Sequence, residues 1–250
     1  MTSASGSRPF LLISTRDDPQ AAEDEVRGFL AAADLSPGDL VVHALDATPL
    51  PADLDLDAYS GILLGGGPFN SSDHPARKST TQVRVEAELA ALLDRLLELD
   101  FPFLGACYGV GTLGVHQGGT VDRTYGEPVG TAHIELTEAG ILDPIAAGLP
   151  RDFDAFVGHK EAISELPGNA VLLATSATCP VQMFRIGTNL YATQFHPELD
   201  ADGLATRIEV YRDAGYFPPE IAGELTELAH AADVSHAATV LRNFVRRYRR

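Results

Sequence analysis

FPFLGACYGVG, at residues 101–111, joins an apolar run to the start of a helical pattern. The apolar residues predict a buried strand over residues 101–105, and residues 112–116 predict a helical turn after it. Gly105 and Gly109 flank Cys107 at positions where small residues relieve crowding as a chain turns sharply from a strand into a helix. The stretch therefore predicts an α/β fold in which Cys107 stands on a nucleophile elbow, in the place that serine takes in many hydrolases.

Cys107 is a candidate nucleophile on this turn. The N-terminus of the following helix stabilises negative charge, so the pattern predicts a pKa of Cys107 below the reference value of about 8.5. The alternative is a small buried apolar residue at a strand end, which is the usual role of a cysteine in an apolar segment. The motif alone does not decide between the two, because short motifs recur by chance. A catalytic cysteine also needs a base.

The stretch QFHPE, at residues 194–198, supplies a candidate base and its orienting acid. His196 would take the proton of the thiol and return it to the leaving amine, while Glu198 would fix the tautomer of the imidazole. Pro197 stiffens the chain between them. Taken separately, His196 reads as a surface histidine and Glu198 as a first-turn helix acid. Their occurrence together with Cys107 favours a catalytic triad.

A glycine run at residues 65–67 ends another apolar segment and is followed by Pro68. In open α/β folds, ligands bind at the carboxyl edge of the sheet, where such a run would lie. The amides of Gly67 and Tyr108 are candidates for an oxyanion hole, because backbone N–H groups stabilise the tetrahedral intermediate of amide cleavage. The alternative is a tight strand-to-helix turn, for which this composition is ordinary.

Short apolar runs alternate with segments of helical period, which predicts a mostly parallel sheet flanked by helices. Residues 10–14, 39–45 and 59–64 are further expected strands of that sheet. A helix is expected over residues 81–99, with one buried stripe formed by Val83, Ala87, Ala90, Leu93 and Leu97. The last helix, over residues 235–248, should bury one side formed by Val240, Leu241, Phe244, Val245 and Tyr248.

The second half of the chain predicts additional antiparallel strands. Residues 130–136, 153–157 and 171–174 show period two or short apolar runs. Residues 181–186 and 190–195 are joined by Gly187, Thr188 and Asn189, which predicts an antiparallel hairpin. These strands should either extend the main sheet or form a small second one.

Length and composition narrow the class of protein. With 250 residues and 45% hydrophobic content, the chain is expected to form one domain over residues 9–250, with a C-terminal helical extension and a disordered leader over residues 1–8. A net charge of −17 argues against nucleic acids and anionic membranes as partners. The sequence lacks a signal-peptide pattern and an apolar run of about 18 residues, so a cytoplasmic location is expected.

Three motifs in this order resemble class I glutamine amidotransferases: Gly67-Pro68, residues 105–109 and residues 194–198. The resemblance spans residues 10–200 and is closest to the glutaminase part of GMP synthetase and its stand-alone relatives. It implies a flavodoxin-like α/β fold. It also implies that Cys107 attacks the side-chain amide of glutamine, releases ammonia and leaves a glutamyl thioester that water hydrolyses. Neither a metal nor an organic cofactor is implied.

Two further positions bear on the substrate. Residues 156–161 resemble a Ser-His-Gly-Asp-like loop beside the active site of relatives, in which His159 and Glu161 match and Gly158 replaces the serine. His159 would contact substrate or a partner, or would be a surface-loop histidine. The family pattern has a substrate-holding Gln where this chain has Gly111. Gly66, Gly111, His159 and Glu161 are therefore candidate substrate-binding residues, and Gly111 puts the identity of the substrate in question.

Three functions follow from these expectations. The first is a glutaminase that passes ammonia to a separate acceptor synthase. The second is a γ-glutamyl peptidase or hydrolase that acts without a partner, and the third is a catalytically silent binding module. The chain has no phosphate-binding loop of the ATP-pyrophosphatase or Walker type. The expected ligand is thus glutamine or another γ-glutamyl small molecule.

Overall fold

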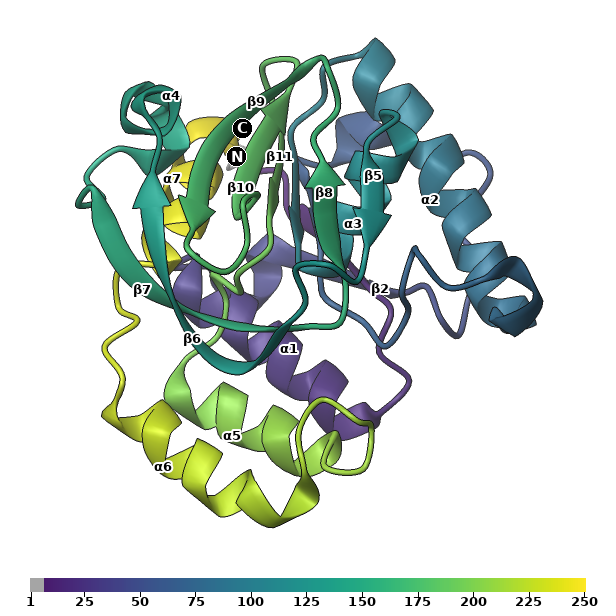
Figure 1. Cartoon of the computed structure of the whole chain (residues 1–250). Coiled ribbons are helices and arrows are strands. Elements are labelled where there is room, and N and C mark those ends of the chain that lie inside the picture. Colours follow the sequence, from purple (N-terminus) through teal and green to yellow (C-terminus); the bar gives the residue numbers. More distant parts are fainter. Residues whose placement is uncertain (1–6) are drawn as a thin grey trace.

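The structure, a computed structural model, describes residues 7–250, in which nine strands form one sheet with helices on both faces (Figure 1). The strand order is β2-β1-β3-β4-β11-β10-β9-β6-β7. Their bounds are Phe10–Ser14 (β1), Leu40–Ala44 (β2), Ile62–Leu64 (β3), Phe103–Ala106 (β4), Glu127–Leu136 (β6), Asp152–His159 (β7), Ala170–Ser176 (β9), Met183–Ile186 (β10) and Leu190–Thr193 (β11).

The sheet has a parallel half and an antiparallel half. Strands β2, β1, β3, β4 and β11 pair in parallel, in the 2-1-3-4-5 order of flavodoxin-like folds. Strands β10, β9, β6 and β7 continue the sheet by antiparallel pairing, and β10 with β11 forms the predicted hairpin. A small second sheet pairs β5 (Thr120–Asp122) with β8 (Ala162–Glu165). The predicted α/β fold with added antiparallel strands is confirmed.

Alternation along β1 divides the core between the two faces of the sheet. Phe10 and Leu12 pack with Phe29 of α1 (Pro19–Ala32) and Phe244 of α7 (Ala238–Tyr248). Leu11 and Ile13 pack under α2 (Thr80–Glu98) and α3 (Tyr108–His116) on the other face. Each such side chain contributes roughly 1.5–3 kcal/mol on full burial. The two apolar layers hold the carboxyl ends of the parallel strands in place.

Helix α2 is rotated relative to the sequence-based expectation. Val83 is 52% exposed, Ala87 is exposed as well, and only Leu93 of the five predicted residues is buried, so the predicted stripe is wrong. The buried side chains are instead Gln82, Val85, Leu89, Leu92, Leu93 and Leu96. Two stripes with helical spacing overlap in this segment, and the one with more leucines buries more apolar area than the one with alanines. The amide of Gln82, which donates to the backbone oxygen of Asn70, fits the same rotation.

The first two helices of the C-terminal region cover the lower end of the sheet in Figure 1. Helices α5 (Ala201–Val210) and α6 (Ala222–Ala231) pack against each other, and α5 also packs on α1. Helix α4 (Glu138–Leu142) lies against β9. Helix α7 buries the predicted side, with Tyr248 partly buried at its end.

The sequence predicted a leader over residues 1–8 and no membrane-spanning segment. Residues 1–6 of the expected leader lie outside the described residues. Within residues 7–250, no helix combines the length and the apolar character that crossing a membrane requires.

Candidate active site

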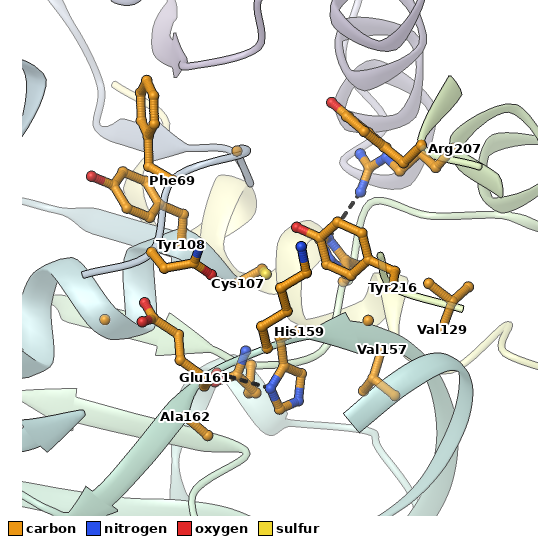
Figure 2. A pocket seen from close by; sticks show the side chains of 18 of the residues that line it. Phe69, Cys107, Tyr108, Val129, Val157, His159, Glu161, Ala162, Arg207 and Tyr216 are labelled. Atoms are coloured by element: carbon orange, nitrogen blue, oxygen red, sulfur yellow. Dashed lines mark hydrogen bonds between the residues drawn. The ribbon is translucent and has the colours of Figure 1, made fainter. Parts of the chain in front are cut away.

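The candidate residues meet at the carboxyl edge of the parallel strands. Arg16 follows β1, Gly65 to Gly67 follow β3, Cys107 follows β4 and His196 follows β11. Parallel strands end at the same edge, so these four segments surround one pocket of about 790 Å³, which includes its open mouth. Figure 2 shows the thiol of Cys107 pointing into this pocket, with Glu161 on one side and Tyr216 on the other.

Cys107 adopts the backbone conformation of a nucleophile elbow. Its φ is 53° and its ψ is −87°, a region that costs an L residue of order 1–3 kcal/mol. The amide of Cys107 donates to the carbonyl of Thr193 at 2.7 Å, which ties the turn to the end of β11. A Cβ on Gly105 would lie 2.7 Å from Cα of Gly109, so the tight turn requires glycine at position 105.

The pKa of the Cys107 thiol differs from the sequence-based expectation. Burial raises it to about 12, although the positive charge of Arg16 and the N-terminus of α3 both favour the thiolate. The expected lowering was wrong because it considered the helix alone, whereas the thiol lies at the bottom of a largely apolar pocket. At neutral pH the group is a thiol, so nucleophilic attack needs a base that removes the proton.

His196 and Glu198 form a buried hydrogen-bonded pair. Nδ1 of His196 and Oε1 of Glu198 are 2.8 Å apart, and both side chains are almost fully buried. Nη1 of Arg207 also lies 3.0 Å from Nδ1, but a nitrogen that donates its proton to Glu198 does not accept another. We therefore assign Nδ1 as the protonated nitrogen. Nε2 is then unprotonated and available as a proton acceptor.

Arg207 and a second arginine surround this pair with buried charge. Nη2 of Arg207 donates to Oε1 of Glu198 at 3.1 Å. Burial alone would raise the pKa of Glu198, but His196 and Arg207 lower it well below its usual range. Burial, together with Arg207 and Arg16, lowers the pKa of His196. Glu198 is therefore ionised and His196 neutral near pH 7, which is the resting state that a general base requires.

Arg16 is anchored beneath the pocket by Glu25 of α1. Nε of Arg16 donates to Oε1 of Glu25 at 2.8 Å, and Ser14 donates to the other carboxylate oxygen at 2.7 Å. Nη1 of Arg16 donates to the hydroxyl of Tyr211 at 3.0 Å. Glu25 has no exposed surface, and a Cβ on Gly65 would collide with its carboxylate. The glycine run after β3 thus leaves room for this acid as well as exposing backbone amides.

The two amides predicted for the oxyanion hole border the same pocket. Within residues 7–250, neither the N–H of Gly67 nor that of Tyr108 donates a hydrogen bond to a protein acceptor. The hydroxyl of Thr15 donates to the carbonyl of Gly66 and occupies the space that a side chain at Gly67 would need. Gly66 faces His196, whose Cε1 would lie 3.2 Å from an added Cβ.

Glu161 and Gly111 lie together on the opposite wall. The carboxylate of Glu161 accepts the backbone N–H groups of Ser71 and Ser72 at 2.6 and 2.8 Å, which holds the loop after β3 over the pocket. A Cβ on Gly111 would lie 2.7 Å from Oγ of Ser71 and 3.2 Å from Oε1 of Glu161. Because Gly111 has no side chain, the loop that contains Ser71 can pack closely against α3 at this position.

His159 is buried at the end of β7, so it is not a surface-loop histidine. Its Nε2 lies 2.8 Å from Oε2 of Glu127 and its Nδ1 lies 2.9 Å from the backbone oxygen of Glu161. Burial alone would raise the pKa of Glu127, but hydrogen bonds from His159 and Thr178 lower it, so the carboxylate is ionised. The side chain of His159 is thus held by hydrogen-bond contacts at both ring nitrogens.

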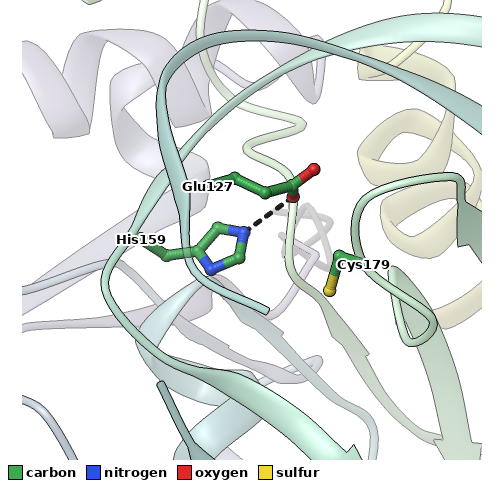
Figure 3. Close-up of side chains that lie close together, drawn as sticks. All are labelled: Glu127, His159 and Cys179. Carbon is green, nitrogen blue, oxygen red and sulfur yellow. Dashed lines mark hydrogen bonds and ion pairs between the residues drawn. The ribbon is translucent and has the colours of Figure 1, made fainter. Parts of the chain in front are cut away.

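Glu127, His159 and Cys179 form a cluster of three potential metal ligands within residues 7–250, and their ligating atoms lie within 4.8 Å of one another (Figure 3). Burial raises the pKa of the Cys179 thiol to about 12, and the thiol donates to the backbone oxygen of Val181. A metal would need the Cys179 thiolate and an unprotonated ring nitrogen of His159, whereas Nε2 of His159 is hydrogen-bonded to the carboxylate of Glu127. The contacts fit a hydrogen-bonded cluster that positions His159 better than they fit a metal centre.

Several residues of this site were not predicted from the sequence. Arg16, Glu25 and Arg207 appeared as isolated charges, and Glu127 carried no motif. A loop after α5 also reaches the pocket through Tyr211 and Tyr216. Lys160 donates to the backbone oxygen of Ala214 at 2.7 Å and lies 4.1 Å from the ring centre of Tyr216. A cluster of aromatic residues was the only sequence signal for this loop.

Comparisons with known proteins show which family and fold the chain shares. Residues 39–208 match the family model described as glutamine amidotransferase class-I. A glutamine-hydrolyzing GMP synthase subunit from Thermococcus kodakarensis is 35% identical over 168 residues, which are 66% of this chain and 77% of that protein. GMP synthase of Lactobacillus delbrueckii subsp. bulgaricus is 33% identical over 143 residues, 57% of this chain. The match spans about a quarter of that longer relative.

Solved structures support the fold. A glutamine amidotransferase from Thermotoga maritima has a TM-score of 0.72 at 21% identity, over 96% of this chain and 98% of its own. A glutamine amidotransferase from Methylobacillus flagellatus has a TM-score of 0.73 at 20% identity, over 98% of this chain and 97% of its own. At these identities the likeness concerns the fold alone.

Proposed function

Because this chain belongs to the class-I glutamine amidotransferase family, we propose that it hydrolyses the side-chain amide of glutamine or of a related γ-glutamyl compound with Cys107, His196 and Glu198 as its catalytic triad. The observation that carries the proposal is the 2.8 Å pair of His196 and Glu198 on the pocket that holds Cys107. The pair leaves Nε2 of His196 free to accept the thiol proton.

In the first half-reaction, Nε2 of His196 takes the proton of Cys107 as the sulfur attacks the amide carbon. The resulting oxyanion would accept the N–H groups of Gly67 and Tyr108, worth about 3–4 kcal/mol for a single donor in other enzymes. His196 then returns the proton to the amide nitrogen. The C–N bond breaks, ammonia or an amine leaves, and a glutamyl thioester remains on Cys107.

In the second half-reaction, water replaces the departed amine. His196 takes one proton from the water while the water oxygen attacks the thioester carbon. The second tetrahedral intermediate collapses, the C–S bond breaks and the proton returns to the sulfur. Glutamate leaves and the thiol is restored. Glu198 stays ionised throughout and stabilises the imidazolium that forms twice in each turnover.

The proposal includes a separate ammonia-accepting synthase in the cytoplasm. Two relatives named as GMP synthase subunits support this part, because they match this chain over most of their length. The longer GMP synthase relatives extend well beyond the matched part, so an acceptor activity would come from another chain or segment.

A γ-glutamyl hydrolase without a partner is the second candidate. It is favoured by the pocket, whose apolar and aromatic lining extends past Cys107 to Tyr211 and Tyr216. Glutamine has only an NH₂ group beyond the scissile bond and would leave that region to water. A larger amine would occupy it.

The experiment measures glutamate released from glutamine and from γ-glutamyl dipeptides by the purified chain and by its Cys107→Ala variant. Turnover of either compound that is lost in the variant supports the triad. Stimulation of glutamine turnover by an added synthase would favour the first candidate, and dipeptide turnover without a partner the second. Absence of turnover, together with no covalent labelling of Cys107 by a glutamine-like diazoketone, would leave a silent binding module.

A further inference from the structure

Three hydrogen-bond donors with no protein acceptor border the pocket on the side of His196. Nη2 of Arg16 donates to no oxygen among residues 7–250, although Nε and Nη1 of the same group are both engaged. The hydroxyl of Tyr211 accepts from Arg16 and donates to none of the described residues. The hydroxyl of Tyr216 likewise has no hydrogen-bond partner among them.

These three groups form one cluster. The guanidinium carbon of Arg16 lies 5.8 Å from the ring centre of Tyr211, and the rings of Tyr211 and Tyr216 are 6.3 Å apart. The missing Cβ of Gly66 would lie 2.8 Å from Nη2 of Arg16 and 3.2 Å from Cε1 of His196. The unused end of the guanidinium and the proposed catalytic base therefore face the same small space.

The cluster offers donors to an anion in the pocket. Arg16 lines the pocket and is only 6% exposed, so a charged donor with no protein acceptor is presented to whatever occupies the pocket. Burial raises the pKa of Tyr216 to about 12, so its hydroxyl keeps its proton at neutral pH. Two nearby carboxylates are engaged by other donors, since Glu25 accepts from Arg16 and Ser14, and Glu161 accepts from the loop after β3.

We propose that Arg16, Tyr211 and Tyr216 form a subsite for a carboxylate of the substrate, which selects γ-glutamyl compounds that carry a carboxylate at this position. The inference rests on the proposed function and adds a substrate class to it. A carboxylate offers planar acceptors to a guanidinium and two hydroxyls. It comes either from the amine that leaves, as in a γ-glutamyl amino acid, or from the α-carboxylate of the glutamyl group.

Two substrate pairs test the subsite. γ-Glutamylglycine and γ-glutamylmethylamide differ in the carboxylate of the leaving amine, while glutamine and its α-amide differ in the α-carboxylate. We expect kcat/KM to favour the carboxylate-bearing member of one pair by roughly tenfold or more. Tyr216→Phe and Arg16→Lys should each reduce that preference several-fold. Tyr59→Phe, a tyrosine outside the pocket, should leave it unchanged.

The outcomes separate the two sources and the two proposals. Reduction of the preference in the first pair identifies the leaving amine, and reduction in the second identifies the α-carboxylate. Preferences that both substitutions leave unchanged overturn the subsite, as does equal turnover within each pair by the unmodified protein. If none of the four compounds is turned over, the proposed function fails. Calorimetric binding of γ-glutamylglycine to Cys107→Ala, with and without Tyr216→Phe, then decides the subsite alone.

Discussion

Arg207 donates from Nη2 to Oε1 of Glu198 at 3.1 Å, the same carboxylate oxygen that faces Nδ1 of His196. The guanidinium and the imidazole therefore share one acceptor oxygen, and the charge of the guanidinium opposes protonation of the ring. This arrangement keeps Glu198 ionised and His196 neutral. It also makes Arg207 a positioning residue, because it acts on the proposed reaction through the other two side chains.

Arg207→Gln should move the acidic limb of the pH profile of kcat/KM to higher pH. Arg207 lowers the pKa of His196 in addition to the larger effect of burial, so its removal raises that pKa and more base is needed to keep the ring neutral. Breaking the buried pair should also reduce the free energy of unfolding by about 3–5 kcal/mol. Arg212→Gln, in an exposed pair with Glu209, should change stability by no more than about 1 kcal/mol. An acidic limb that stays in place would contradict the role given to Arg207.

Cys107→Gly should be more stable than Cys107→Ala by about 1 kcal/mol, measured by denaturant unfolding. The reason is the φ of 53° at this position, which glycine adopts without the cost that an L side chain incurs. Both variants should lack turnover and retain the native circular dichroism spectrum. Equal stability of the two would show that the elbow stores no strain.

Gly111→Ala and Gly109→Ala should differ although both lie in α3. Alanine favours a helix over glycine by roughly 1 kcal/mol. A Cβ at Gly109 would make only an ordinary contact with Leu64 at 3.8 Å, so that substitution should raise the melting temperature. A Cβ at Gly111 would press on Ser71 and Glu161, so the gain should be lost and KM should change as the loop shifts. A stability gain at position 111 equal to that at position 109 would refute this account.

Glu127→Gln should reduce the free energy of unfolding by about 1.5–3 kcal/mol at neutral pH, because hydrogen bonds to a buried charge are lost. The folded pKa of Glu127 is below its usual 4.5, so the stabilisation is present above that value and lost as the pH falls through the folded pKa. The difference between the two proteins should therefore shrink in acid. Glu138→Gln, in an exposed pair with Arg151, serves as the control and should show little effect at any pH. A difference that grows in acid would contradict the assignment.

The sequence predicted those elements of the fold whose residue spacing is contained within a single segment. The elbow around Cys107, the hairpin of β10 and β11 and the buried side of α7 all follow from spacing that one segment carries by itself. Helix α1 was not predicted, although Asp18 caps its first turn and Pro19 begins it. Its interior contains Glu25 and Gly28, which interrupt an apolar stripe because one pairs with Arg16 and the other packs against the backbone of Glu198.

The buried charges of the site lay beyond prediction for a related reason. A lone Arg16 or Arg207 is normally a solvated side chain, and only the packing of helix α5 near the end of β1 brings them to one pocket. The same holds for Glu127 and Cys179, which are far apart in sequence and meet beside His159. The roles of the triad and of the oxyanion amides remain predictions until activity is measured.

The hydrogen bond from the amide of Cys107 to the carbonyl of Thr193 has a kinetic consequence. Strand β11 enters the parallel half of the sheet only after the whole antiparallel region has been synthesised, and it pairs with β4 from the first half. Such non-local pairing is slow to form during folding. Recovery of glutaminase activity after dilution from denaturant should therefore lag behind the recovery of helical signal, and a nascent chain that has not yet emerged to Thr193 would lack the hydrogen bond that ties the turn at Cys107 to β11.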